Sequence, residues 1–228
     1  MVPRFSQAAK LRSSVMGMSE TSEKSLLLGR KASDVRRAGS LLLFGGLEVL
    51  LLMTLAEALY LGYSTHTNTI SDLAAVGAPT WLFFDPSVFV WGVCWFVGAY
   101  FLFRGRGKKG LMIVNLLPGI GVTLASLSPE NVNIAVHSIG AVLAFIPGAV
   151  AMMLSYRLIK SSLRYFALSL GALSLVAVVI YFGAYYSTIV QDTLGSGGSE
   201  RIIVYPILIW LIAFGSYLLS RENQSEVM

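Results

Sequence analysis

Charged residues are scarce in this chain. They make up 13% of its 228 residues, against 55% that are hydrophobic, whereas a soluble domain normally carries about 25% charged residues. The chain has a single cysteine, Cys94, inside an apolar run, which excludes a disulfide scaffold, a thiol redox pair and a cysteine-rich metal site within one chain. The composition therefore indicates a protein whose main solvent is lipid.

Apolar runs long enough to cross a bilayer, which takes about 20 residues in a helix, occur six times. They predict an all-α fold, a bundle of six transmembrane helices over residues 38–220. The runs at 87–103 and 111–127 are short and should lie near the bilayer normal. The predicted helices are Ala38–Leu61, Ser87–Phe103, Leu111–Leu127, Asn133–Ser155, Leu163–Tyr186 and Ile202–Leu219.

Residues 1–37 are polar and basic and show no sustained helical period, which predicts a disordered tail. Residues 221–228 form a second, short tail. The first apolar run begins near Ala38 and is too long for the core of a signal peptide, so we expect it to remain as a membrane helix. Translation can start at Met1, Met16 or Met18.

Positive charge is concentrated on one side of these runs. Of the 17 Lys and Arg residues, all except Arg201 fall in the N-terminal tail, the second and fourth connections or the C-terminal end. The positive-inside rule then places both termini in the cytoplasm, which requires an even number of helices. Because the basic residues flank apolar runs, the net charge of +5 indicates orientation in the cell membrane and not nucleic-acid binding.

The fourth run carries small residues at four-residue spacing, Gly140, Ala144 and Gly148. Such a stripe lets a neighbouring backbone approach closely. Pro118-Gly119 and Pro147-Gly148 fall inside the third and fourth runs, where we expect them to kink the helices.

Both histidines and most acids outside the tails map to the opposite, outer side. Helix capping explains many of these acids, since a capping oxygen binds free N–H groups at a helix start. Thr69-Ile70-Ser71-Asp72 fits a capping box that opens a short interfacial helix. Three further helix starts have an acid beside a capping residue or proline: Asp85-Pro86, Ser128-Pro129-Glu130 and Ser199-Glu200.

A functional interpretation of the same residues starts at His137, about one turn into its helix. Asp72 and Glu130 can meet it at the outer membrane level, together with Ser71 and Ser126. Carboxylates with an imidazole can perform acid–base chemistry or hold a divalent metal. Asp72, Glu130 and His137 are therefore the candidate catalytic residues, although neither His-x-x-x-His nor Gly-x-Ser-x-Gly is present. A metal is left open and no other cofactor is expected.

Candidate binding residues are drawn from three observations. Glu48 lies deep in the first run, where an acid is costly, so it should face the bundle and have a partner. Three helices start on the outer side, and their N-termini, with Arg201, can hold an anionic lipid head group. Asn133 precedes His137 by four residues and shares its face. The candidate binding residues are Glu48, Asn68, Ser71, Asn133 and Arg201.

Several motifs resemble those of a prokaryotic membrane family, the domain of unknown function 998. They are Asn68-Thr69-Ile70-Ser71-Asp72 after the first helix, Ser128-Pro129-Glu130 with His137, and Glu200-Arg201 before the last helix. The resemblance covers about residues 38–220. It implies six membrane helices and no assigned activity, and it supplies no catalytic residues.

Three function classes remain open. The chain can bind or transport an amphiphile, a lipid head group or an ion at the outer face. It can be a membrane-embedded hydrolase, with or without a metal, that uses Asp72, Glu130 and His137. It can also be a structural or partner-binding subunit. Membrane lipid and an amphiphilic or ionic ligand are the expected partners, and the oligomeric state is not indicated.

Overall fold

Helices form all the regular structure of a computed structural model that describes residues 5–107, 109–184 and 188–223. No strand occurs in these ranges, so the predicted all-α class is confirmed. The helices are α1 (Phe5–Leu59), α2 (Ile70–Leu73), α3 (Trp81–Arg106), α4 (Lys109–Leu127), α5 (Ile134–Leu154), α6 (Leu163–Ala184), α7 (Thr188–Thr193) and α8 (Gly195–Asn223), with a 3-10 turn at Ser155–Arg157.

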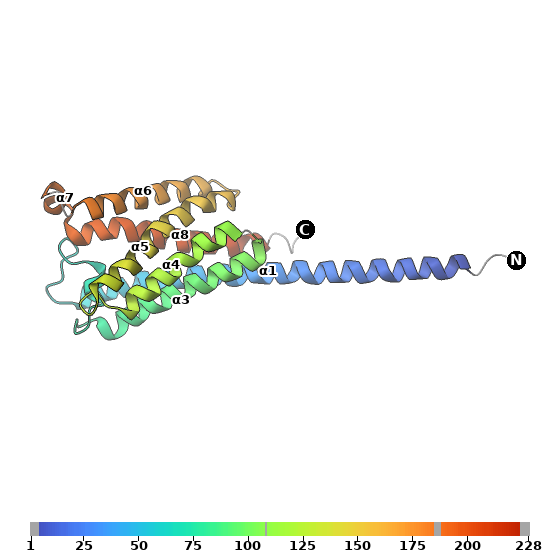
Figure 1. The fold of residues 1–228 in the computed structure, drawn as a ribbon, viewed down its shortest axis with the longest axis horizontal. Helices are drawn as coiled ribbons and strands as arrows, with labels where there is room; N and C mark the ends of the chain where they lie inside the picture. Colours follow the sequence, from blue (N-terminus) through green and yellow to red (C-terminus); the bar gives the residue numbers. More distant parts are fainter. Residues whose placement is uncertain (1–4, 108, 185–187, 224–228) are drawn as a thin grey trace.

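The long helices form a ring in which neighbours along the chain pack side by side and α8 returns to contact α1 (Figure 1). The connections at 60–80 and 128–133, with α7, lie at one end of this bundle, here called the cavity end. The α3–α4 and α5–α6 connections and the last turn of α8 lie at the other, here called the tail end. The first half of α1 projects beyond the tail end.

Five of the helices, α1, α3, α5, α6 and α8, are long and apolar enough to cross a membrane. The apolar part of α4, Ile113–Leu127, is shorter. It lies between α3 and α5 along the bundle. The prediction of several membrane helices is thus supported, and the count of six spans stays a prediction.

Glycines provide the close contacts around the ring. Two helix axes approach closely only where a side chain is missing, and in lipid such packing replaces the hydrophobic effect. The predicted stripe on the fourth run is used in this way, because Gly140 packs on Ala125 of α4 and Ala144 packs on Gly121. Further ring contacts made by glycine include Gly45 on Cys94, Gly92 on Thr123, Gly171 on Met153, and Gly39 on Gly215.

The first helix starts much earlier than predicted. We expected a disordered tail up to residue 37, but α1 is continuous from Phe5. Proline is absent between Phe5 and Leu59, and the packed part anchors the exposed part, so the helix continues past its last contact. C-terminal residues 221–223, expected in a tail, continue α8. Residues 1–4, Lys108, Tyr185, Tyr186, Ser187 and 224–228 lie outside the described residues.

Two helix starts predicted from acidic caps are wrong. α3 begins at Trp81, so Asp85 and Pro86 lie inside it. α8 begins at Gly195, so Ser199 and Glu200 lie inside that helix as well. The stretch Gly195–Gly198 was expected to be a loop, yet the missing side chain at Gly197 allows α8 to pack on Thr65 and Asn68. Tertiary contact therefore overrides the low helix propensity of glycine.

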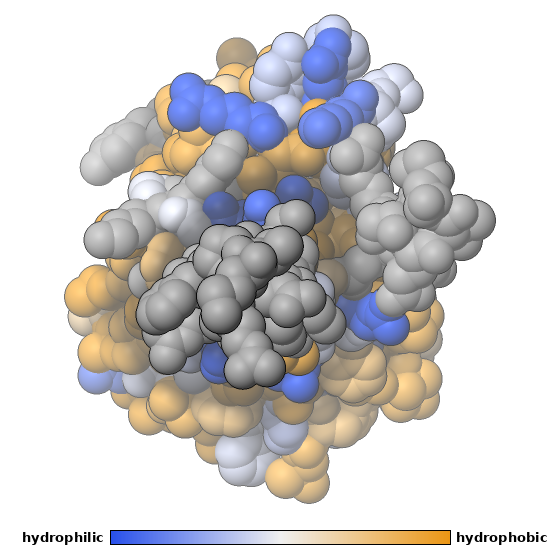
Figure 2. All heavy atoms as spheres, turned by 90° about the vertical axis from the view of Figure 1, so that its right-hand side faces the viewer, coloured by the Kyte–Doolittle hydropathy of each residue, from blue (hydrophilic) through white to orange (hydrophobic). Residues whose placement is uncertain are grey.

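A buried acid fastens the tail end. Asp34 is 3% exposed, and its carboxylate lies 3.2 Å from Arg104 Nε and 3.7 Å from Arg37 Nη1. The contact joins α1 to the end of α3. Asp34 lies in residues 1–37, the segment that was expected to be disordered. Figure 2 views this end and shows hydrophilic residues gathered over it, with hydrophobic residues around the rim.

Adding one methyl group at the α1–α8 crossing should destabilise the bundle. A Cβ atom at Gly215 would lie 2.6 Å from Leu43 N and 2.7 Å from Gly39 O, and neither backbone atom can move alone. We expect Gly215→Ala to cost about 1–3 kcal/mol in free energy of unfolding, measured in mixed micelles. Gly29→Ala is the matched control, because no described atom lies within 4 Å of that position; equal stability of the two variants would contradict the packing.

Candidate functional site

The short helix α2 places the predicted outer motif at the cavity end. Thr69 is its N-cap: the Thr69 side chain accepts from Asp72 N, and Asp72 Oδ2 accepts from Thr69 N at 2.9 Å. This is the predicted capping box, and it is confirmed. Asn68 Nδ2 also donates to Asp72 Oδ2, at 3.1 Å. The carboxylate of Asp72 therefore stabilises the start of α2. The preceding residue, Ser71, lines the cavity inside the bundle.

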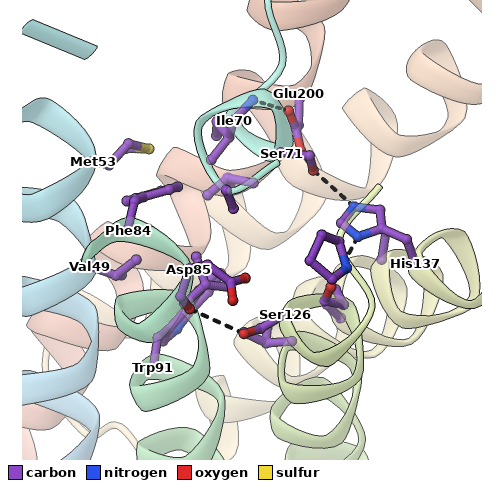
Figure 3. Close-up of a pocket in the computed structure, with 18 of the residues that line it drawn as sticks. Val49, Met53, Ile70, Ser71, Phe84, Asp85, Trp91, Ser126, His137 and Glu200 are labelled. Carbon is purple, nitrogen blue, oxygen red and sulfur yellow. Dashed lines mark hydrogen bonds between the residues drawn. The ribbon is translucent and has the colours of Figure 1, made fainter. Parts of the chain in front are cut away.

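Ser71 and His137 meet across the cavity end. Ser71 Oγ lies 2.9 Å from His137 Nε2, although 66 residues separate them. His137 is the fourth residue of α5, about one turn in as predicted, and it extends toward α2 (Figure 3). A single turn of helix on each side thus aligns a hydroxyl with an imidazole.

The hydrogen bonds of His137 determine which ring nitrogen is basic. Nδ1 lies 3.1 Å from Ala125 O and 3.1 Å from Ser128 O. Carbonyl oxygens only accept, so Nδ1 carries a hydrogen. In the neutral ring Nε2 is then an acceptor, and the Ser71 hydroxyl donates to it.

Glu200 contacts the same serine from α8. Glu200 Oε2 accepts from Ile70 N at 2.5 Å, and Oε1 lies 3.4 Å from Ser71 Oγ. The residue is 6% exposed. Its carboxylate binds the first N–H of α2, whereas the sequence predicted that it capped its own helix.

A cavity of about 70 Å³ lies beneath these residues, lined by Ser71, His137 and Glu200 together with apolar side chains from α1, α3, α4, α5 and α8 (Figure 3). Among the described residues, two lining groups that are buried lack a hydrogen-bond partner, Asp85 Oδ1 and Trp91 Nε1. One is an acceptor and the other is a donor. An unpaired buried polar group is costly. Both atoms are buried in this conformation, so a ligand or water in the cavity would pair with them after a small turn of the side chain.

Arg201, next to Glu200, is fully occupied. It is 6% exposed, and its Nη2 donates to Glu57 Oε1 and to Tyr63 Oη, both at 2.6 Å. Nε also donates to Glu57, and Nη1 donates to the backbone oxygens of Thr65, Asn68 and Gly197. Sequence reasoning treated Arg201 as a free cation for an anion. In the structure it binds α1 and the 63–69 loop to α8.

Burial also affects groups outside the membrane helices. It raises the pKa of the Tyr63 hydroxyl, and the hydrogen bond from Arg201 opposes this shift only in part. Tyr63 therefore stays protonated and donates to Thr69 O at 2.6 Å. Burial likewise raises the pKa of the Glu130 carboxyl, against the opposing effect of His137.

The other predicted site residues lie outside the cavity lining. Asn133 is the N-cap of α5 and accepts from Val136 N at 3.1 Å. Asn68 accepts from Ser64 N, and Glu130 lies in the turn before α5. Glu48 faces Ser87, yet within the described part of the chain its buried Oε2 atom has no hydrogen bond of acceptable geometry. Of the three catalytic candidates, His137 is the one that lines the cavity.

No group of three or more His, Cys, Asp and Glu residues that could hold a metal ion is found in the described ranges. Sequence reasoning missed Trp91, Glu57 and the unpaired state of Asp85. Tryptophan and an acid inside apolar runs are visible in the sequence, but their partners are set by the fold. The sequence did indicate that Ser71 and His137 could meet, because both were expected at the outer level of the membrane.

The fold is that of a multi-pass helical membrane protein with a mainly apolar cavity near one end of its bundle. The chain belongs to the family described as protein of unknown function (DUF998), whose model matches residues 43–217. That range includes α2, the cavity and the Arg201 contacts. No curated protein and no solved structure matches the chain.

Removing Arg201 should unfasten the cavity end. Arg201→Met leaves the Glu57 carboxylate, 18% exposed, without its cation, and we expect a loss of about 3 kcal/mol in free energy of unfolding. The double variant Arg201→Met/Glu57→Leu should recover part of this loss, because both charges are then gone. Lys160→Met, at an exposed cation, should change stability by less than about 0.5 kcal/mol. If Arg201→Met matched Lys160→Met, the contact would not hold the fold.

Proposed function

We propose that this membrane protein binds the head of an amphiphile at its outer face, and that the head carries a positive charge or a hydrogen-bond donor. Asp85 is the counter-group. The observation that carries the proposal is that Asp85, a residue that lines the cavity, has a buried Oδ1 atom with no partner among the described residues. A cationic or donating head would supply the missing hydrogen bond.

The charges around the cavity favour such a head over an anion. Asp85 and Glu200 both line it. No Lys or Arg is among the residues that line it, and Arg201, next to Glu200 in the chain, is paired with Glu57 at 2.6 Å. An anionic head group would therefore meet two carboxyl groups and no Lys or Arg side chain of the lining. This argues against the anionic lipid head group considered from the sequence.

The size and walls of the cavity limit the ligand. A volume of about 70 Å³ holds a small head or a few water molecules, because one water needs roughly 10–15 Å³ on the same measure. The walls include Met53, Phe84 and Val88, which suit the first carbons of an alkyl chain. The rest of an amphiphile would lie along the lipid-facing surface.

The proposal includes the orientation of the chain. We infer six spans, with the tail end in the cytoplasm and the cavity end outside. The support is the positive-inside rule together with four basic residues at the tail end: Arg104 and Arg106 lie in the last turn of α3, and Arg157 and Lys160 follow α5. α4 then counts as a span despite its short apolar part.

Cysteine accessibility tests this orientation. In a Cys94→Ala background, Val132→Cys lies at an exposed position of the cavity end and Lys160→Cys at an exposed position of the tail end. A membrane-impermeant maleimide should modify Val132→Cys in intact cells and Lys160→Cys only after permeabilisation. The reverse pattern, or modification of both in intact cells, would overturn the six-span topology.

Ligand binding is tested with two amphiphiles that differ only in the head, decylamine and decanoic acid. In lipid nanodiscs, decylamine should raise the thermal unfolding midpoint of the wild type, by a gain of about 2.7 kcal/mol at 100 times its Kd. Decanoic acid should not. Asp85→Asn should abolish the decylamine response, because the amide removes the negative charge.

Glu48→Gln is the matched control for that variant. Glu48 is also an acid in a membrane helix, but it is not one of the cavity-lining residues, so the response to decylamine should persist. Asp85→Asn should itself remain folded, since the amide keeps the size of the side chain and Oδ1 makes no hydrogen bond that would be lost. An equal midpoint shift in the wild type and Asp85→Asn would rule out Asp85 as the counter-group.

A further inference from the structure

We propose that Ser71 is a nucleophile and His137 its general base, in a centre that hydrolyses a carboxylic ester of an amphiphile. This goes beyond the proposed binding function. It uses the same cavity, but it does not require a cationic head or Asp85. It also replaces the catalytic set expected from the sequence, of which Asp72 is engaged in the capping box.

The first support is the geometry of the pair. A nucleophilic serine needs a base within hydrogen-bond reach that is itself oriented by a third group. Ser71 Oγ lies 2.9 Å from His137 Nε2. The orienting groups are the Ala125 and Ser128 carbonyls, each 3.1 Å from Nδ1. They leave Nε2 as the nitrogen that takes up the serine proton.

The direction of the serine hydroxyl follows from its two neighbours. A hydroxyl has one hydrogen to donate, and Ser71 Oγ has two acceptors nearby. His137 Nε2 at 2.9 Å is closer than Glu200 Oε1 at 3.4 Å. The hydrogen is therefore directed at the imidazole, as a general base requires.

Ser71 is also held in place before any substrate binds. It is the second residue of α2, which is closed on one side by the capping box and bound on the other by Glu200 through Ile70 N at 2.5 Å. A nucleophile whose supporting contacts are already made needs little rearrangement for reaction. The serine is half-buried and lines the cavity.

The cavity offers complementary groups for an ester. Trp91 is 7% exposed, and its Nε1 hydrogen has no acceptor in the described part of the chain. The Trp91 side chain lines the same cavity, and a small turn of the buried indole would let this N–H donate to the carbonyl oxygen of a substrate. Apolar walls from α1 and α3 suit the acyl chain. The pairing of an N–H donor with apolar walls favours an acyl ester over a phosphate ester, which would meet the Asp85 and Glu200 carboxylates.

The reaction proceeds in two steps. Ser71 Oγ attacks the ester carbonyl carbon as its proton passes to His137 Nε2. The carbon–oxygen bond to the alcohol then breaks, and the alcohol leaves with the proton from His137. Water next attacks the acyl-Ser71 ester, gives one proton to His137 and releases the carboxylic acid, and that proton returns to Ser71 Oγ. Ester and water are consumed, and alcohol and acid are formed.

An alkyl fluorophosphonate, which reacts with serines activated by a base, tests the proposal on the full chain in lipid nanodiscs. Peptide mapping by mass spectrometry should place one adduct on Ser71 of the wild type, with loss of fluoride. Ser71→Ala should remove the adduct. His137→Gln should slow labelling at least about 100-fold, within the usual contribution of a general base. Ser161→Ala, at an exposed serine of the α5–α6 connection at the tail end, should label at the wild-type rate.

Folded wild-type protein that gives no adduct at Ser71 would overturn the proposal, as would equal labelling rates in the wild type and His137→Gln. The wild-type measurement needs no variant, so misfolding of Ser71→Ala cannot obscure it. The thermal unfolding midpoint of His137→Gln is measured as well, so that its labelling rate is compared with that of the wild type while both are folded. Labelling reports on Ser71 and the decylamine response reports on Asp85, so the failure of one is distinguished from the failure of the other.

Discussion

The buried ion pair between Arg201 and Glu57 joins segments that are far apart in the chain. Removing a guanidinium from water is costly, and the cost is offset only if every N–H finds a partner. Arg201 meets this requirement with one carboxylate, one phenol and three backbone carbonyls. The acceptors come from α1, the 63–69 loop and α8. A loop that forms neither helix nor strand is thereby given one conformation.

The same turn of α8 positions the polar residues of the cavity. Glu200 precedes Arg201 and faces α2, where it binds Ile70 N. Gly197, one turn earlier, has its N–H bonded to His66 O at 3.0 Å and leaves room for Asn68 O. One helix start therefore fixes the loop through Arg201 and its backbone, and fixes α2 through Glu200. The position of Ser71 opposite His137 follows from these contacts, because α2 has only four residues and cannot place itself.

Most of the fold was predictable because lipid imposes a simple requirement on the sequence. Backbone groups in hydrocarbon must bond within their own segment, so long apolar runs are helices, and the runs near α4, α5 and α6 were placed within a few residues. The capping box at Thr69 was predictable because its partners are local. The starts of α3 and α8 were not, since Asp85 and Ser199 have the sequence of caps while tertiary contacts extend each helix. The same reason hid the Arg201–Glu57 pair, whose members are 144 residues apart.

For the candidate site, the sequence indicated that the polar residues lie at the same outer level of the membrane. It did not indicate which of them form hydrogen bonds with one another. Ser71 and His137 were both expected at the outer ends of their helices, and that expectation needs only the topology. Asp72 had both a capping and a catalytic interpretation in the sequence, and the structure places its carboxylate in the capping box, whose three-residue spacing is local. Asp85 was assigned to a cap, and Trp91 was given no role. Their unpaired atoms depend on which side chains surround them, and that is a property of the packed bundle.

Glycine contacts and polar contacts both stabilise this bundle, and their positions leave room for a ligand between its two ends. Helices in lipid gain little from apolar burial against one another, so close glycine contacts and satisfied polar groups supply the stability. Asp34 with Arg104 fastens the tail end, and Arg201 with Glu57 fastens the cavity end. Between them lie Glu48, Asp85 and Trp91, each with a buried polar atom that lacks a partner among the described residues. Because the ends are already secured, these unpaired groups are tolerated, and two of them line the one place where Ser71 and His137 meet. A ligand that pairs them would gain hydrogen bonds without rearranging the fold, which is the condition for binding at little conformational cost.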